Sequence, residues 1–188
     1  MLTAHQVLEG YLFGVFPMAD EDNHAIINWY EPKKRGIILP SDFKVSKSLR
    51  LLYQKNIFDK SINKDFEATM RACANRGETW ISEDIIEVFM GLKSLKFGYS
   101  FEIWQDKKLV GGLYGVRMGN VFFGESMFHT VSNASKLAMV YLMEWAIETG
   151  IQLIDCQYIT DHLKQFGAKE ITQKAYLKLL GKNVLVES

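Results

Sequence analysis

The sequence predicts an α+β or mixed α/β fold, in which a run of strands is followed by a helix, a strand and further helical pieces. Three apolar stretches, residues 99–104, 109–117 and 121–128, are separated by turn formers and predict an antiparallel meander. A long helix that Ser132 or Asn133 caps should follow and end near Gly150. Residues 151–158 predict the next strand, and a chain of 188 residues is long enough for one substantial core.

The segments that flank the meander are mostly helical. Residues 7–14 predict a short helix, and residues 26–29 and 36–39 predict short strands around the turn at Glu31-Pro32. Further helices are expected over residues 46–53, 65–75 and 82–95, of which the last begins at the good helix starter Ser82. After the last strand, a short helix over residues 161–166 should stop at Gly167, and residues 176–180 predict a final helical piece.

Composition excludes several classes of protein. At 48% hydrophobic and 23% charged residues, the chain has the composition of an ordinary globular domain. It has no run of about 18 apolar residues, and its first residues lack the pattern of a signal peptide, so we expect no transmembrane helix and a cytoplasmic protein. Cys73 and Cys156 lie in segments that look buried, which favours free thiols. The four histidines show no metal-ligand spacing, so we expect no metal and no other cofactor.

Charge is unevenly distributed along a chain whose net charge is zero. Between Lys33 and Lys60 there are eight basic and two acidic residues, which makes this segment net +6 and the remainder net −6. Such asymmetry indicates contact with a polyanion. The alternative is an ordinary lysine-rich surface in contact with solvent.

Two short apolar stretches each contain a carboxylate: Glu125 within residues 122–128 and Asp155 within residues 153–157. Burying an unpaired carboxylate costs several kcal/mol, so each needs a partner or a task. Because strand side chains alternate, Asp155 and Gln157 should share one face about 7 Å apart, as should Glu125 and Met127. An acid, an amide and a thioether within an apolar sheet predict a site for a ligand that is both apolar and charged. A structural ion pair or a helix cap is the alternative for each carboxylate.

Nine short motifs follow one another over nearly the whole chain. They are residues 14–18 (GVFPM), Trp29-Tyr30 with Pro32 and Arg35-Gly36, residues 45–50 (VSKSLR), 79–81 (TWI), 110–115 (VGGLYG), 122–128 (FFGESMF), 133–136 (NASK) and 153–157 (LIDCQ), and His162-Leu163 followed by Phe166-Gly167-Ala168. In combination they resemble the motifs of bacterial leucyl/phenylalanyl-tRNA–protein transferases.

This resemblance implies a small N-terminal domain, residues 1–35, followed by an N-acetyltransferase-like mixed α/β domain, residues 36–188. It implies an aminoacyltransferase that moves leucine or phenylalanine, with methionine left open, from aminoacyl-tRNA to the α-amine of proteins with N-terminal Arg or Lys. The modification marks those proteins for degradation. The expected partners are therefore aminoacyl-tRNA and such proteins, with no membrane.

The chemistry expected of such an enzyme is mainly positioning and proton removal, because the ester of an aminoacyl-tRNA is already activated. We assign this positioning and proton removal to Asp155, Gln157 and Glu125. Asp155 is expected to attract the acceptor's ammonium group and to stay aligned through Gln157, and Glu125 is the natural counter-charge for an N-terminal amine or a basic side chain. Cys156 should face away from Asp155 and Gln157, so we interpret it as a structural thiol and not as a nucleophile.

Substrate contacts are predicted from aromatic, apolar and basic residues. Trp80 is expected to stack on the terminal adenine, together with Met18, which stands where some members of the family have tryptophan. A pocket for leucine or phenylalanine is expected, although core packing is the alternative for its members. They are Leu113, Phe122, Met127, Met139, Leu142 and Ile154. The tRNA body is expected to contact Lys33, Lys34, Arg35, Lys44, Lys47 and Arg50.

Two other functions remain open on the residues alone. An acyl-coenzyme A-dependent N-acyltransferase would usually need a glycine-rich loop before the long helix, and residues 130–135 contain no glycine. A non-catalytic RNA-binding module would account for the basic segment but not for the buried acid and amide.

Overall fold

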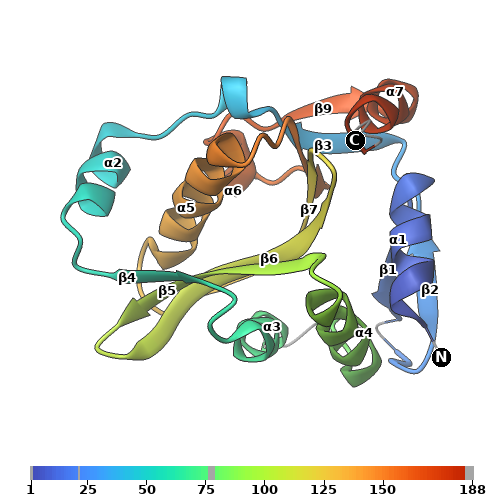
Figure 1. Ribbon diagram of the computed structural model, residues 1–188, viewed down its shortest axis with the longest axis horizontal. Coiled ribbons are helices and arrows are strands. Elements are labelled where there is room, and N and C mark those ends of the chain that lie inside the picture. The colour runs from blue at the N-terminus through green and yellow to red at the C-terminus, as the bar shows by residue number, and fades with distance from the viewer. Residues whose placement is uncertain (1, 21, 76–78, 185–188) are drawn as a thin grey trace.

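A seven-stranded sheet forms the frame of the protein in the computed structural model, which describes residues 2–20, 22–75 and 79–184 (Figure 1). The strands lie in the order β4-β5-β6-β7-β8-β3-β9. Their bounds are β3 Lys34–Ile38, β4 Asp59–Ile62, β5 Gly98–Gln105, β6 Lys108–Met118, β7 Val121–His129, β8 Leu153–Gln157 and β9 Lys169–Thr172. Neighbouring strands are antiparallel except β7 and β8, which run parallel. The mixed α/β fold and the three-stranded meander are therefore confirmed.

Helices cover both faces of this sheet and create two apolar layers. On one face, α5 (Ala134–Glu148) and α2 (Lys47–Gln54) pack over Phe122 and Ile154. On the other face, α3 (Phe66–Ala74), α4 (Glu83–Ser94) and α7 (Gln173–Val184) pack over Phe123 and Leu153. Figure 1 shows α5 above and α3 and α4 below the strands β5 and β6. Because side chains alternate along a strand, consecutive apolar residues of β7 and β8 supply both layers.

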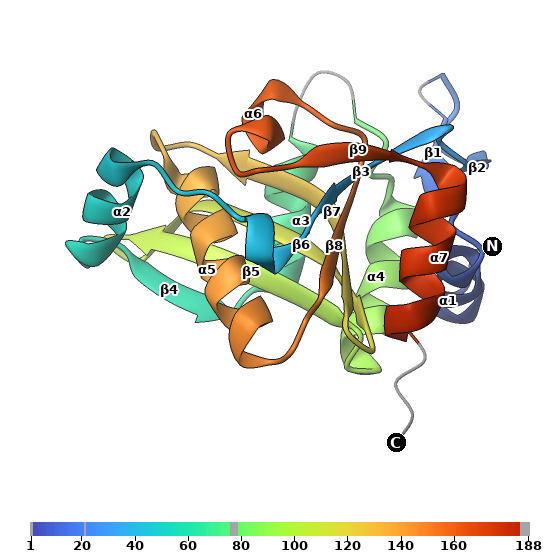
Figure 2. The ribbon, with the colours of Figure 1, turned by 90° about the horizontal axis from the view of Figure 1, so that it is seen from above.

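The N-terminal segment forms a second, smaller sheet that packs against the main one. Helix α1 (Ala4–Leu12) begins with a capping box between Thr3 and Gln6, and β1 (Phe16–Ala19) pairs with β2 (Ile27–Tyr30). The ring of Tyr11 in α1 stacks on Phe123 of β7, with 4.4 Å between the ring centroids. Figure 2 shows α1 and α7 side by side at one end of the molecule. A domain boundary after residue 35 stays a prediction.

Local signals place most helix starts where the sequence predicted them. Ser46, Asp65 and Ser82 each cap a helix by accepting a hydrogen bond from a backbone N–H in its first turn. The side-chain cap predicted for α5 is absent: Asn133, the residue before Ala134, is in the left-handed conformation with φ of 67° and makes no cap hydrogen bond through its side chain. Among the described residues, no helix is long and apolar enough to cross a membrane.

Three strands were not predicted: β1, β4 and β9. The two edge strands of the main sheet, β4 (DKSI) and β9 (KEIT), are short and carry exposed charged residues. Short charged edges are typical of natural sheets, because they discourage pairing with other chains. Their sequences therefore lack the apolar alternation that identifies a strand, and only their pairing with β5 and β3 defines them.

Candidate active site

A cavity of about 530 Å³ lies where β7 and β8 separate. The paired residues of these two parallel strands end at Phe123 and Asp155, and the following residues of both strands line the cavity. Its apolar wall contains most of the residues predicted for the substrate pocket. These are Leu113, Met127, Met139, Leu142 and Ile154.

Two β-bulges direct polar side chains into this cavity. In β7, Gly124 and Ser126 face consecutive residues of β6, so Glu125 between them is the extra residue. In β8, Asp155 and Gln157 face consecutive residues of β3, so Cys156 is the extra residue, and Gln157 has a φ of 59°. A bulge inserts one residue and changes the face on which the following side chains lie. Glu125, Cys156 and Gln157 therefore line the cavity, whereas Asp155 does not.

Glu125 of β7 accepts hydrogen bonds from two other elements, α1 and β8. Its Oε1 accepts a hydrogen bond of 2.6 Å from the hydroxyl of Tyr11 and one of 3.0 Å from Nε2 of Gln157. Its Oε2 has no hydrogen-bond partner among the described residues, and the side chain is 9% exposed. Burial is the main cause that raises the pKa of Glu125 to about 8, and the hydrogen bond from Tyr11 opposes this shift.

Asp155 lies behind this wall in a fully satisfied network. Nε of Arg35 donates to Oδ1 at 2.9 Å, and Nη2 donates to Oδ2 at 2.6 Å. The hydroxyl of Tyr176 donates to Oδ2 at 2.7 Å, and the backbone N–H of Gln157 donates to Oδ1 at 2.8 Å. Both Arg35 and Asp155 are 0% exposed. Although burial opposes it, the hydrogen bond and charge of Asp155 hold the pKa of Arg35 above its usual value.

This geometry corrects two predictions about Asp155 and Arg35. Asp155 was expected to share a face with Gln157, but the bulge at Cys156 places the two side chains on different faces. Asp155 was also expected to attract the acceptor's ammonium, but its carboxylate already forms an ion pair with Arg35. Asp155 instead accepts a hydrogen bond from the backbone N–H of Gln157 and so fixes the position of that backbone. Arg35 was expected to contact tRNA, but it is wholly buried and cannot reach a polyanion at the surface.

Two other predicted substrate residues lie outside the cavity lining. Phe122 is 0% exposed and packs against Phe101 and Trp145, so the alternative of core packing holds for it. Met18 is half-buried on β1. The next residue, Ala19, donates a backbone hydrogen bond of 3.2 Å to the carbonyl of Trp80, which does line the cavity. Met18 and Trp80 therefore belong to neighbouring segments.

Several side chains of the site were not predicted. The hydroxyl of Tyr11 in α1 donates to Glu125, and that of Tyr176 in α7 donates to Asp155. Arg35 was predicted only as a tRNA contact and not as the partner of Asp155. Cys156 lines the cavity, contrary to expectation, but burial raises the pKa of its thiol and disfavours a thiolate nucleophile. His162 also lines the cavity, where burial lowers its pKa. The sequence gives no local signal for the two tyrosines, because Tyr11 lies 114 residues from Glu125 and Tyr176 lies 21 residues from Asp155.

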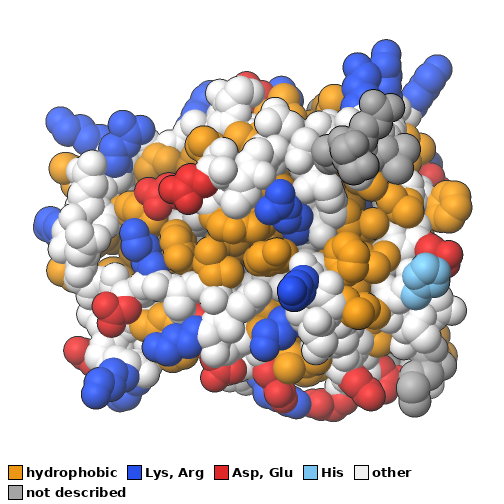
Figure 3. Space-filling view, in the orientation of Figure 1, with side chains coloured by type: hydrophobic (Ala, Val, Ile, Leu, Met, Phe, Trp, Pro, Cys, Tyr) orange, Lys and Arg blue, Asp and Glu red, His pale blue; other side chains and the backbone are white. Residues whose placement is uncertain are grey.

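The exposed members of the predicted basic surface divide into two groups. Lys44, Lys47 and Arg50 belong to α2 and the segment before it, and Lys33 and Lys34 stand at the start of β3. Figure 3 shows Lys and Arg side chains at the corner of α2 and at the opposite corner near β3 and α7.

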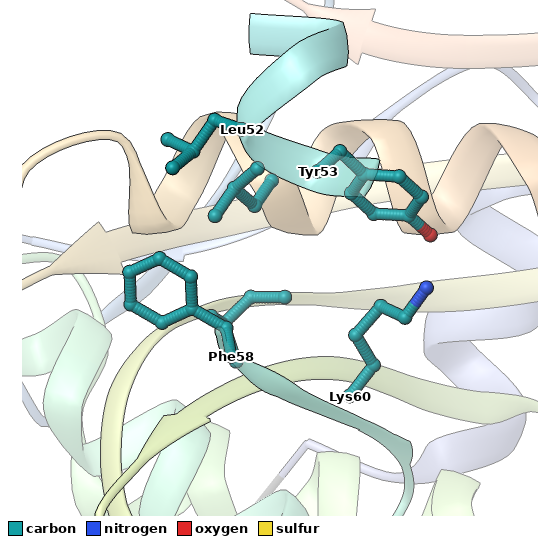
Figure 4. A pocket seen from close by; sticks show the side chains of 6 residues that line it. Leu52, Tyr53, Phe58 and Lys60 are labelled. Atoms are coloured by element: carbon teal, nitrogen blue, oxygen red, sulfur yellow. The ribbon is translucent and has the colours of Figure 1, made fainter. Parts of the chain in front are cut away.

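A second hollow near α2 is too small to be a binding site. It measures about 10 Å³, close to the least that holds one water molecule. In Figure 4 the ammonium of Lys60 approaches Tyr53, 4.0 Å from the centroid of the ring.

Comparison with known proteins agrees with this architecture. A GCN5-related N-acetyltransferase from Kribbella flavida has a similar fold, with a TM-score of 0.50 at 15% identity over 73% of this chain and 53% of that one. The parallel strands that separate around a cavity thus place the protein in the class with an N-acetyltransferase-like fold.

The particular family follows from sequence comparison. The family model for leucyl/phenylalanyl-tRNA protein transferase matches residues 37–181, and the model of its N-terminal domain matches residues 1–33. A leucyl/phenylalanyl-tRNA–protein transferase of Paramagnetospirillum magneticum is 48% identical, covering 93% of this chain and 86% of that protein. One from Zymomonas mobilis is 44% identical, covering 96% of this chain and 69% of that protein. The chain belongs to the leucyl/phenylalanyl-tRNA–protein transferase family.

Proposed function

We propose that the protein transfers leucine or phenylalanine from aminoacyl-tRNA to the α-amine of proteins that begin with Arg or Lys. The reaction takes place in the cytoplasm, where charged tRNA is present, and it marks the acceptor for degradation. Family membership supports the class of reaction. The observation that carries the proposal is the cavity of about 530 Å³, in which an apolar wall faces Glu125 and Gln157.

The apolar wall suits the donor amino acid. Leucine and phenylalanine gain free energy when their side chains leave water, and a concave apolar pocket with a few polar groups is the usual form of a small-ligand site. Met127 and Met139 supply flexible thioethers, which adapt to a branched or an aromatic side chain. Trp80 at the edge of the cavity is suited to stack on the terminal adenine, with Met18 on the adjacent strand.

Glu125 suits the acceptor. It is the one acidic side chain among the described residues that line the cavity. An N-terminal Arg or Lys brings two positive charges, the α-ammonium and the side chain. In a cavity of low dielectric, a carboxylate attracts such a residue more strongly than it attracts a neutral one, and it repels an acidic one.

The reaction needs orientation more than covalent help. The ester carbon of the donor is already activated, so the amine has to be placed beside it and to lose a proton. Gln157 is held at the cavity by its hydrogen bond to Glu125 and by the contact between its backbone and Asp155. The exposed residues Lys33, Lys34, Lys44, Lys47 and Arg50 are suited to bind the phosphates of the tRNA body.

The test mixes the protein with leucyl- or phenylalanyl-tRNA and four peptides that differ only in their first residue, which is Arg, Lys, Ala or Glu. Mass spectrometry should find the donor amino acid added to the Arg and Lys peptides only. Uncharged tRNA is the control for the donor. Equal modification of all four peptides would exclude the proposed acceptor choice. Acetylation of the peptides with acetyl-coenzyme A, without transfer from tRNA, would support the acyl-coenzyme A alternative.

A further inference from the structure

We propose that Oε2 of Glu125 accepts the proton that the acceptor's α-ammonium must lose before it attacks the aminoacyl ester. The inference rests on the proposed function and deepens it. It assigns to Glu125, beyond the attraction of a cationic residue, the role of general base, and it removes that role from Asp155.

One oxygen of the Glu125 carboxylate is buried, with almost no exposed surface of its own, and it is unpaired among the described residues. Oε1 of Glu125 is occupied by Tyr11 and Gln157, whereas Oε2 has no hydrogen-bond partner among the described residues. The side chain is nine-tenths buried, yet it lines the cavity. The nearest guanidinium, that of Arg35, is bound to Asp155. Oε2 is therefore an acceptor without a donor, at the place where a cationic donor is expected to bind.

Other groups nearby are less suited to take the proton. Both oxygens of Asp155 accept two hydrogen bonds each, and Asp155 is not part of the cavity lining. The amide of Gln157 can accept a hydrogen bond but is not a base at neutral pH. His129 and His162 line the same cavity, so they are the rivals that an experiment has to separate from Glu125.

The groups that face Glu125 adjust its basicity. The pKa of Glu125 is raised to about 8 as the net result of opposing effects. Burial is the largest and raises it, as does the charge of Asp155, whereas the hydrogen bonds from Tyr11 and Gln157 and the charge of Arg35 lower it. An α-amine has a pKa of about 8. Proton transfer between groups of matched pKa near the working pH is efficient, and a bound ammonium favours the ionised carboxylate at the moment it is needed.

The step balances as follows. The ammonium gives one proton to Oε2, and its nitrogen attacks the ester carbonyl carbon, so that a C–N bond forms. The bond between this carbon and the ribose oxygen then breaks, and the second proton of the nitrogen goes to that oxygen, which leaves as a hydroxyl. Glu125 finally releases its proton to water.

Tyr11→Phe provides the first test, because it removes a hydrogen bond that stabilises the ionised form of Glu125. The single-turnover rate at saturating acceptor should fall on the acidic side of its pH profile, and the midpoint of this acidic limb should move up by about one pH unit. The rate should recover at higher pH. Tyr53→Phe is the matched control, because it removes a hydroxyl that donates to Glu144 outside the cavity. An unmoved limb in Tyr11→Phe, or a limb that moves in His129→Gln or His162→Gln instead, would overturn the proposal.

A second test uses Glu125→Gln, which keeps the shape of the side chain and removes its basicity. With an arginine-initiated peptide, turnover at saturating acceptor should fall about a hundredfold or more. With an aminooxy-terminated peptide, whose nitrogen is neutral at pH 7, the loss should be at least about tenfold smaller. If turnover of Glu125→Gln falls equally with both acceptors, while the unmodified protein still transfers the amino acid, the role of Glu125 as base is refuted. Absence of transfer by the unmodified protein would instead refute the proposed function.

Discussion

Arg35 of β3 holds both carboxylate oxygens of Asp155 of β8, at 2.9 and 2.6 Å, and neither side chain is exposed. The guanidinium also donates to the carbonyl of Gly14 at 2.8 Å and lies over the ring of Tyr176, 4.4 Å from its centroid. The pair therefore connects the N-terminal segment, two strands and the last helix directly behind the cavity. Asp155 is thus a buried structural support that does not line the cavity.

Breaking this pair should destabilise the protein strongly. Asp155→Asn leaves the charge of Arg35 buried without a counter-charge, and we expect a loss of about 3 to 5 kcal/mol in the free energy of unfolding. Urea denaturation measures it. Asp161→Asn, which breaks the exposed ion pair with Lys164, is the control and should change little. If the free energy of unfolding of Asp155→Asn falls only slightly, Arg35 must contact another acceptor or water in the variant.

Gln157 should matter for turnover beyond its effect on stability. Gln157→Ala removes the amide that holds Glu125 across the cavity, so turnover should fall about a hundredfold or more in a folded protein. Because Asp155 and Gln157 act as one unit, the double variant with Asp155→Asn should be little worse than the worse single variant. Single-turnover kinetics on charged tRNA measure this. Gln152→Ala, an exposed change on the segment before β8, should leave turnover unchanged, and strictly additive losses in the double variant would contradict the mechanism.

Two methionines of α5 allow the effect of the pocket to be distinguished from that of the core. Met139 lines the cavity, whereas Met143, one turn later and equally buried, is not among the lining residues. Met139→Ala enlarges the pocket and should shift the donor preference from leucine towards phenylalanine by roughly tenfold in kcat/KM. Met143→Ala should cost about 2 kcal/mol or more in stability without changing the preference. An identical shift in both variants would mean that general loosening of the core, and not pocket shape, sets the preference.

Charge on α2 should govern affinity for tRNA but not chemistry. The double change Lys47→Glu and Arg50→Glu should raise the KM for charged tRNA and leave turnover at saturation nearly intact. Affinity of the unmodified protein should fall about tenfold or more between about 50 and 200 mM salt, and the double variant should show a shallower dependence. The same reversal at Lys107 and Lys108, exposed residues of the hairpin between β5 and β6, is the control. Unchanged affinity at moderate salt would identify the basic segment as an ordinary solvated surface.

Sequence patterns by themselves determined most of the secondary structure and the general position of the site. Apolar stretches bounded by turn formers identified the meander, and the capping residue Ser82 identified the start of α4. The cost of burying a carboxylate identified Glu125 and Asp155 as exceptional, and the motifs identified the family. These signals are local, so one chain segment contains all that is needed to recognise them.

Only the tertiary structure decided which acid reaches the cavity. A strand sequence predicts strict alternation, and an extra residue at Glu125 or Cys156 appears only when the neighbouring strand shows which residues pair. The partners are also remote: Arg35 lies 120 residues from Asp155, and Tyr11 lies 114 residues from Glu125. Such contacts depend on how the sheet, α1 and α7 pack together. For this physical reason Arg35 appeared in the sequence as one more surface cation, whereas it is the buried counter-charge of Asp155, which does not line the cavity.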